Sequence, residues 1–193
     1  YPGNAQLYII GKEGGRPELV TSLPVSNISI NNNGVALYED YKGYEDSFRK
    51  HHTSSVTRDI WAYKPSAVGE FAINADGEFT KLSSFKGEDR NPVFSADGNS
   101  FYFLSEEDGT LNIYKSSLDN PGKKEQLTFF KGNPVRYLSV SDNDLISFSY
   151  DGELYTLRNG EKPEKIDITI ITDQTERPIQ ERTITTGARD MAV

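Results

Sequence analysis

The sequence contains no cysteine, which excludes disulfides, thiolate metal sites and a cysteine nucleophile. Histidine is also scarce, with only the adjacent pair His51 and His52. No apolar run approaches the roughly 20 residues that a helix needs to cross a bilayer. We therefore expect no membrane insertion. Lys and Arg number 21 against 29 Asp and Glu, which argues against nucleic-acid binding through a broad electrostatic surface.

The common catalytic and phosphate-binding motifs are missing as well. The chain has no Gly-x-Ser-x-Gly nucleophile elbow, no Gly-x-Gly-x-x-Gly and no Gly-Lys-Ser/Thr loop. These absences argue against α/β-hydrolase and nucleotide chemistry. The Asp-Gly pairs, such as Asp97-Gly98, lack the alternating oxygen donors of a calcium loop and fit tight turns better. We expect no catalytic residue, no metal site and no cofactor in this chain.

Aromatic residues, by contrast, are plentiful at 11%, beside a modest hydrophobic total of 35%. This balance favours β-strands, whose pleated surface suits large side chains. The segment 91–128 is the clearest example of strand patterning in the chain. Four short runs that favour strands are joined there by polar turns; they are Pro92–Ser95, Ser100–Ser105, Thr110–Lys115 and Glu125–Thr128. The pattern predicts a four-stranded antiparallel meander.

This meander recurs along the chain, with an aromatic residue at a similar place in the third run of each unit. The recurring aromatics are Tyr8, Trp61, Tyr114 and Tyr155. Repeated meanders predict an all-β chain that forms a β-propeller segment of four-stranded antiparallel blades. We predict full blades at about 23–84, 87–128 and 132–168, a partial blade at 1–22, and a linker with the first strand of a further blade at 169–193. Residues 1–193 would then be one fragment of a larger propeller.

The first full unit is interrupted by a polar and aromatic insertion at Asp40–Thr57. Long loops on a rigid scaffold often carry binding residues, so this loop is the candidate site for peptides or a protein partner. The candidate residues are Tyr41, Tyr44, Phe48, Arg49, Lys50, His51, His52 and Arg58. The three basic side chains Arg49, Lys50 and Arg58 could bind a peptide carboxylate.

Two chemical alternatives remain open for the insertion. His51 or His52 could form a hydrolytic triad with nearby Ser54, Ser55, Asp46 or Asp59, or the two histidines could bind zinc. Adjacent residues of an extended segment point to opposite faces, which makes one metal bound by both awkward. An ordinary surface loop, or a loop that contacts a ligand, is the favoured interpretation.

The middle unit resembles the blade repeat of the TolB and tricorn protease propellers. The resemblance rests on Pro92–Gly98, Phe101–Ser105, Asp108-Gly109, Asn112–Tyr114 and Gln126–Thr128. Ala96 stands where that repeat usually has proline, and the unit near Gly132 lacks glycine at its Ser141–Asp144 turn. The run Thr57–Trp61 after the insertion is most similar to the bacterial tricorn-type serine peptidases.

The resemblance implies a non-catalytic propeller that precedes separate peptidase domains and guides or filters peptides. It implies peptides, protein partners and other domains of the same parent chain as binding partners. The alternative is a TolB-like module for protein binding or assembly, with no peptidase attached. Either resemblance implies a periplasmic or other extracytoplasmic location, although a cytoplasmic one remains open.

Overall fold

The computed structural model describes residues 6–44, 53–66 and 77–171, and within these ranges every regular element is a β-strand. Strands β1 (Leu7–Ile9) and β2 (Glu18–Thr21) form an antiparallel pair. The remaining twelve strands form three antiparallel sheets, each with its four strands in sequence order. The predicted all-β class and the four-stranded units are therefore confirmed.

The three sheets are consecutive blades along the chain. The first contains β3 (Val25–Ile30), β4 (Ala36–Asp40), β5 (Ile60–Lys64) and β6 (Glu78–Lys81). The second contains β7 (Asp89–Phe94), β8 (Ser100–Ser105), β9 (Asn112–Ser117) and β10 (Lys124–Gln126). The third contains β11 (Arg136–Val140), β12 (Ile146–Tyr150), β13 (Glu153–Leu157) and β14 (Glu164–Lys165). We call them blades 1, 2 and 3.

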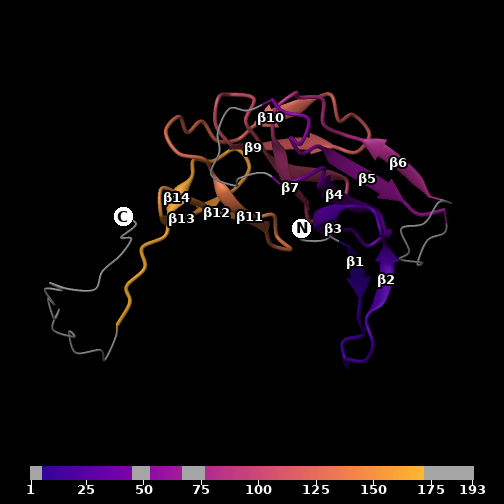
Figure 1. Cartoon of the computed structure of the whole chain (residues 1–193). Helices are drawn as coiled ribbons and strands as arrows, with labels where there is room; N and C mark the ends of the chain where they lie inside the picture. The colour runs from indigo at the N-terminus through magenta and orange to yellow at the C-terminus, as the bar shows by residue number, and fades with distance from the viewer. Residues whose placement is uncertain (1–5, 45–52, 67–76, 172–193) are drawn as a thin grey trace, which may run out of the picture.

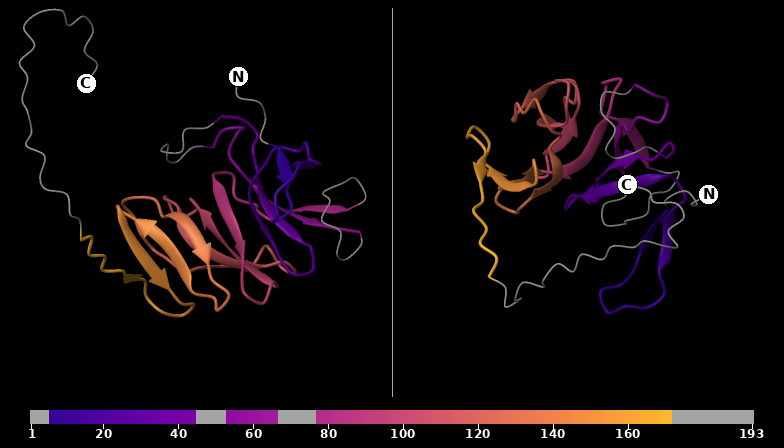
Figure 2. Two further views of the ribbon diagram at one scale, coloured as in Figure 1. Left: turned by 90° about the horizontal axis from the view of Figure 1, so that it is seen from below. Right: turned by 60° about the vertical axis from the view of Figure 1, so that its left-hand side comes forward.

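The blades stand side by side along an arc, with their first strands on the inner side (Figures 1 and 2). The inner strand β7 contacts both neighbouring inner strands, β3 and β11. The last strands β6, β10 and β14 lie on the outer side (Figure 1). The sheets do not close into a ring, so the described residues form part of a propeller.

Each inner strand contains a bulge at the same place. The strand register shifts between Ser26 and Ser29, between Arg90 and Val93, and between Arg136 and Ser139. Inside these bulges Asn27, Asn91 and Tyr137 have positive φ angles of 47°, 49° and 55°. A bulge bends a strand and redirects a side chain. The repeated feature therefore aims one residue of each blade in an equivalent direction.

Apolar side chains fill the spaces between successive blades. Blades 2 and 3 share a cluster that includes Tyr102, Leu104, Ile113, Val135, Ile146 and Phe148. Blades 1 and 2 share one that includes Leu37, Ile60, Phe94, Phe101 and Tyr114. Leu7 and Val20 of the β1–β2 pair pack on the other face of blade 1, against Val25, Ala36, Tyr38 and Tyr63. Each four-stranded sheet thus buries its faces only by stacking on a neighbour.

The recurring aromatic position predicted from the sequence belongs to a column of cross-strand pairs. Trp61 lies opposite Tyr38, Tyr114 opposite Phe103, and Tyr155 opposite Phe148. The rings of Phe148 and Tyr155 stack with centroids 5.5 Å apart. Tyr8, the fourth member, stays half exposed. Directly opposed aromatic residues are among the pairs that stabilise a sheet most, so the repeat is explained by folding.

Several predicted strand limits were wrong. Within 91–128 only β8 has the expected limits; β9 begins two residues later than expected, and β10 ends two residues earlier. Strand β7 begins at Asp89, three residues before the expected Pro92, because Glu88 to Arg90 are buried polar residues that no apolar pattern reveals. The run Glu164–Ile168, which the sequence predicts as the last strand of the third unit, is a strand only at Glu164–Lys165 (β14), and residues Ile166–Ile171 are not in a strand. The predicted first strand of a further blade lies outside the described residues.

Candidate functional site

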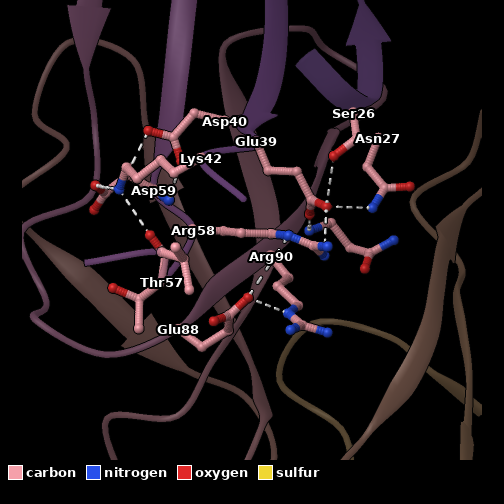
Figure 3. Close-up of polar contacts among 12 residues, drawn as sticks. Ser26, Asn27, Glu39, Asp40, Lys42, Thr57, Arg58, Asp59, Glu88 and Arg90 are labelled. Atoms are coloured by element: carbon pink, nitrogen blue, oxygen red, sulfur yellow. Dashed lines mark hydrogen bonds and ion pairs between the residues drawn. The ribbon is translucent and has the colours of Figure 1, made fainter. Parts of the chain in front are cut away.

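The loop between β4 and β5, described at residues 41–44 and 53–59, has its two ends fastened together by charge (Figure 3). Lys42 Nζ donates to the backbone oxygen of Thr57 at 2.7 Å and lies 2.5 Å from the Asp59 carboxylate. The Asp59 backbone NH donates to Asp40 at 2.8 Å. Lys81 on β6 binds the same Asp59 carboxylate at 2.8 Å. The insertion therefore leaves and returns to the sheet at a fixed point.

The titration of Asp59 reflects this pairing. Burial alone would raise the pKa of Asp59, but hydrogen bonds and charge from Lys42 and Lys81 outweigh it and hold the pKa below its ordinary value. Burial likewise opposes the charged form of Lys42, yet Asp59 and Asp40 raise its pKa. Asp59 is thus an ionised structural anchor. A role as the orienting acid of a histidine triad would compete with these two lysines.

A second anchor is Glu39 on β4, whose side chain is fully buried. One carboxylate oxygen accepts hydrogen bonds from Ser26 at 2.9 Å, Asn27 at 2.8 Å and Arg58 at 3.0 Å. The other accepts the backbone NH of Asn91 at 2.8 Å. Four donors make burial of this charge tolerable. Glu39 therefore ties the bulges of two neighbouring inner strands to the base of the loop.

Arg58 extends from the loop towards two buried carboxylates, Glu39 of blade 1 and Glu88 at the start of blade 2 (Figure 3). Arg58 Nη1 lies 3.0 Å from Glu39 Oε1, and Arg58 Nε lies 3.9 Å from Glu88 Oε1. Glu88 also pairs closely with Arg90. The Tyr41 ring lies 5.5 Å from the Arg58 guanidinium, within the range of a cation–π contact. The backbone oxygen of Arg58 accepts from Asp89 NH at 3.1 Å, which places the loop base beside an inner strand.

The sequence-predicted site residues are therefore of three kinds. Tyr41 and Arg58 are part of the anchor that holds the loop, and Arg58 is already bound to carboxylates of its own chain. Tyr44 is 81% exposed and available for contact. The others, Phe48, Arg49, Lys50, His51 and His52, lie outside the described residues, so their role stays a prediction.

Sequence reasoning missed the buried charges that position the loop, above all Glu39, Glu88 and Arg90. A signal was present, because Glu39 interrupts the apolar run of β4 and the charged run Glu88-Asp89-Arg90 stands at the start of β7. A charged residue in a buried strand is unusual and needs a partner. The sequence alone does not say which residue is the partner of each buried charge.

Asp89 is the second residue of that charged run and is 1% exposed. Burial raises the pKa of Asp89 to about 7; the charges of Asp59 and Glu107 add to the shift, whereas Ser105 and Lys124 oppose it. Neither carboxylate oxygen meets the geometry of a hydrogen bond to a described residue. Asp89 is thus a buried acid that titrates near neutral pH.

At the opposite end of the inner strands, the three turns after β3, β7 and β11 surround a polar pocket of about 320 Å³. These turns are joined across blades by hydrogen bonds. Asn31 Nδ2 donates to the oxygen of Gly98 at 3.1 Å, and Ala96 NH donates to Asp144 at 2.8 Å. Both ends of the inner strands are therefore built from polar contacts between blades.

Within the described ranges, no group of three or more His, Asp or Glu side chains is arranged to hold a metal ion. The same part of the chain has no helix long and apolar enough to span a membrane.

Three antiparallel four-stranded sheets stacked along an arc define the class: a β-propeller, present as a partial array of blades. More particularly, the fold is that of the tricorn and TolB propellers. The crystal structure of the tricorn protease matches with a TM-score of 0.70 and 23% identity over 90% of this chain and 15% of that chain. The expected fold resemblance is thereby confirmed.

Two TolB structures show the same likeness. A putative TolB from Agrobacterium tumefaciens matches with a TM-score of 0.64 and 20% identity, over 85% of this chain and 57% of that one. TolB from Acinetobacter baumannii matches with a TM-score of 0.60 and 17% identity, over 86% of this chain and 38% of that one. No family model and no curated protein sequence matches the chain. At these identities the likeness establishes the fold.

Proposed function

We propose that this chain is a non-catalytic propeller module that guides or filters peptides, as part of a tricorn-like peptidase, and contacts neighbouring domains of the same parent protein. The observation that carries the proposal is the long β4–β5 loop, fastened by Lys42, Arg58 and Glu39 beside the inner strands. A loop whose base is fixed on a rigid scaffold is suited to present binding residues. The likeness to the tricorn protease propeller supports it.

The test is peptide binding by the chain and by a variant in which residues 45–52 are replaced with a short Gly-Ser linker. The linker leaves the Lys42–Asp59 contact in place. Tryptic peptides of β-casein serve as a defined pool, and retention on the immobilised chain is read by mass spectrometry. We expect the intact chain to retain a subset of peptides and the linker variant to lose it. Equal retention by both would remove the loop from the site.

The second candidate is a TolB-like protein-binding or assembly module with no peptidase attached. It is supported by the likeness to the two TolB structures. This candidate predicts no retention of short peptides. It predicts instead a folded protein partner, whose cross-links to the loop are mapped by mass spectrometry. Cross-links to Lys42 or Lys81 that vanish in the linker variant would support it.

We also propose a periplasmic or other extracytoplasmic location, in line with TolB-like modules; the cytoplasm is the alternative. Fractionation of cells that express the intact parent protein, followed by immunodetection of this segment, tests the location. Recovery with the osmotic-shock fraction is the expected result. Recovery only with cytoplasmic marker enzymes would contradict it.

A further inference from the structure

The residue at the inner-strand bulge differs among the three blades. Asn27 and Asn91 take the positive φ in blades 1 and 2, whereas Tyr137 takes it in blade 3. Asparagine is enriched in the left-handed region, but a bulky residue there is an outlier. The conformation costs an ordinary L-residue about 1–2 kcal/mol, so the surroundings must compensate for it.

The described contacts do not explain this choice of residue. In blade 1, Asn27 donates to Glu39, and in blade 2 the Asn91 backbone donates to the same carboxylate. Strand pairing places Leu104 of blade 2 in the position equivalent to Glu39, and an aliphatic side chain accepts no hydrogen bond. Tyr137 is 79% exposed. Strain and an exposed aromatic ring therefore coincide at one residue.

The exposure of Tyr137 reflects its position in the inner-strand bulge and not only the number of blades packed against blade 3. Blade 2 has a neighbour on both faces, and its equivalent residue Asn91 is still partly exposed. The bulge residue of an inner strand thus stays accessible even where its blade is flanked on both faces. Tyr137 lies on β11 next to β7, at the end where the β4–β5 loop is fastened. Strained residues cluster at functional sites, and the inference runs from the outlier to the function.

We propose that Tyr137 is a specificity-determining residue on the inner side of the propeller, where its ring stacks on an aromatic side chain of an extended peptide. This inference rests on the proposed peptide-guiding function and names the class of peptide that blade 3 selects. An exposed, rigid tyrosine ring offers contact area at low entropic cost, and aromatic pairs gain beyond their buried area. The asparagines at the equivalent bulges of blades 1 and 2 offer hydrogen bonds and no such surface.

The experiment uses two capped heptapeptides of Gly and Ser, one with a central Phe and one with a central Ala. Binding to the isotope-labelled 193-residue chain is measured by NMR titration, and thermal unfolding is followed in parallel. We expect the chain to prefer the Phe peptide. The variant Tyr137→Asn should bind the Phe peptide about tenfold more weakly, which is typical of removing an aromatic anchor. Its unfolding midpoint should be unchanged or raised by about 2–4 °C, because strain is relieved.

Two further variants separate a binding role from a structural one. Tyr137→Phe keeps the ring and should keep the preference for the Phe peptide within about twofold. Tyr8→Asn removes a half-exposed tyrosine from β1 and should leave that preference unchanged. Tyr137→Gly takes the positive φ most readily and repeats the test if the asparagine variant folds poorly.

The possible failures are distinguishable. Binding of both peptides with equal affinity, unchanged in Tyr137→Asn, would overturn the role of Tyr137 and leave peptide binding intact. Binding of neither peptide, together with no retention of casein peptides, would overturn the proposed function and this inference together. A lower unfolding midpoint in both Tyr137→Asn and Tyr137→Gly would show that the ring is structural and overturn the inference.

Discussion

Between blades 1 and 2 the position paired with the inner-strand bulge holds a buried carboxylate, Glu39, whereas between blades 2 and 3 it holds Leu104. The first junction is crossed by a hydrogen bond from Asn91 to Glu39 and an ion pair from Arg58 to Glu88. Both junctions contain an apolar cluster; in the second, Leu104 belongs to that cluster with Val135 and Phe148, whereas the first adds buried charges beside its own. One blade design thus uses two kinds of junction.

The difference shows what each kind contributes. An apolar junction gains free energy in proportion to the surface that it removes from water, and it tolerates small shifts. A buried ion network gains little net free energy because both charges lose hydration, but it requires a particular geometry. The polar junction is the one beside the long loop. We infer that blade 1 carries charge there to hold the loop in place rather than to increase stability.

The largest expected effect is at Glu39. Glu39→Ala leaves Arg58 without its nearer carboxylate and the Asn91 NH without its acceptor. Removing one partner of a buried ion pair typically costs about 3–5 kcal/mol of unfolding free energy. Urea unfolding of both proteins at one pH measures this loss. A change below about 1 kcal/mol would mean that the partners of Glu39 are not left buried and uncompensated, because that is the range of exposed pairs.

A double variant then converts the polar junction towards the apolar one. Glu39→Leu with Arg58→Met places aliphatic side chains where the ion pair was, as Leu104 does one blade later. Replacing a complete buried pair is often neutral or stabilising. We expect the double variant to recover part of the stability that Glu39→Ala loses, since Arg58 is no longer buried without a partner while the Asn91 NH still lacks its acceptor, but to bind peptides poorly because the loop base is released. Recovery of both properties would contradict the division of roles between the junctions.

The apolar junction is tested at Leu104, which is 2% exposed. Leu104→Ala removes buried methyl groups and leaves a cavity, so we expect a loss of about 3 kcal/mol with no change in peptide binding at the loop. Urea unfolding gives the first value and casein-peptide retention the second. Loss of retention in a variant that remains folded would show that the two junctions are coupled.

The sequence predicts the apolar contacts between blades far better than the buried charges at the base of the loop. Alternating aromatic and aliphatic residues, with Asp97-Gly98 and Asp151-Gly152 at the turns, are enough to predict the strands, their order and the stacked blades, because these features are local. Glu39 and Asn91 are 52 residues apart, and only the completed stack of blades brings them together. The insertion was predicted as the candidate site. Its buried anchors were not, because a partner in another blade leaves no periodic signal.

A smaller effect, dependent on pH, is expected at Asp89 between the two junctions. Its pKa rises from an ordinary value of 3.8 to about 7 in the folded chain, chiefly through burial. Folding therefore takes up a proton between these values, and stability falls as the pH rises through that window. Asp89→Asn removes the titration. The unfolding free energy of the variant minus that of the parent chain should therefore be about 2 kcal/mol larger at pH 8 than at pH 5. Equal differences at both pH values would exclude a raised pKa.

The smallest effect on global stability is expected at Lys42, whose side chain is about one-third exposed. Lys42→Met keeps the aliphatic stem but removes the bonds to Thr57 and Asp59, so the unfolding free energy should fall by about 1 kcal/mol or less.

The loop itself should respond more strongly. Because the anchor no longer holds its ends, we expect limited trypsin digestion to cut the insertion several times faster than in the parent chain. Lys12→Met, on the exposed β1–β2 turn, is the matched control. If digestion of the insertion is as slow in Lys42→Met as in this control, the polar junction does not restrain the loop, and its buried charges need another explanation.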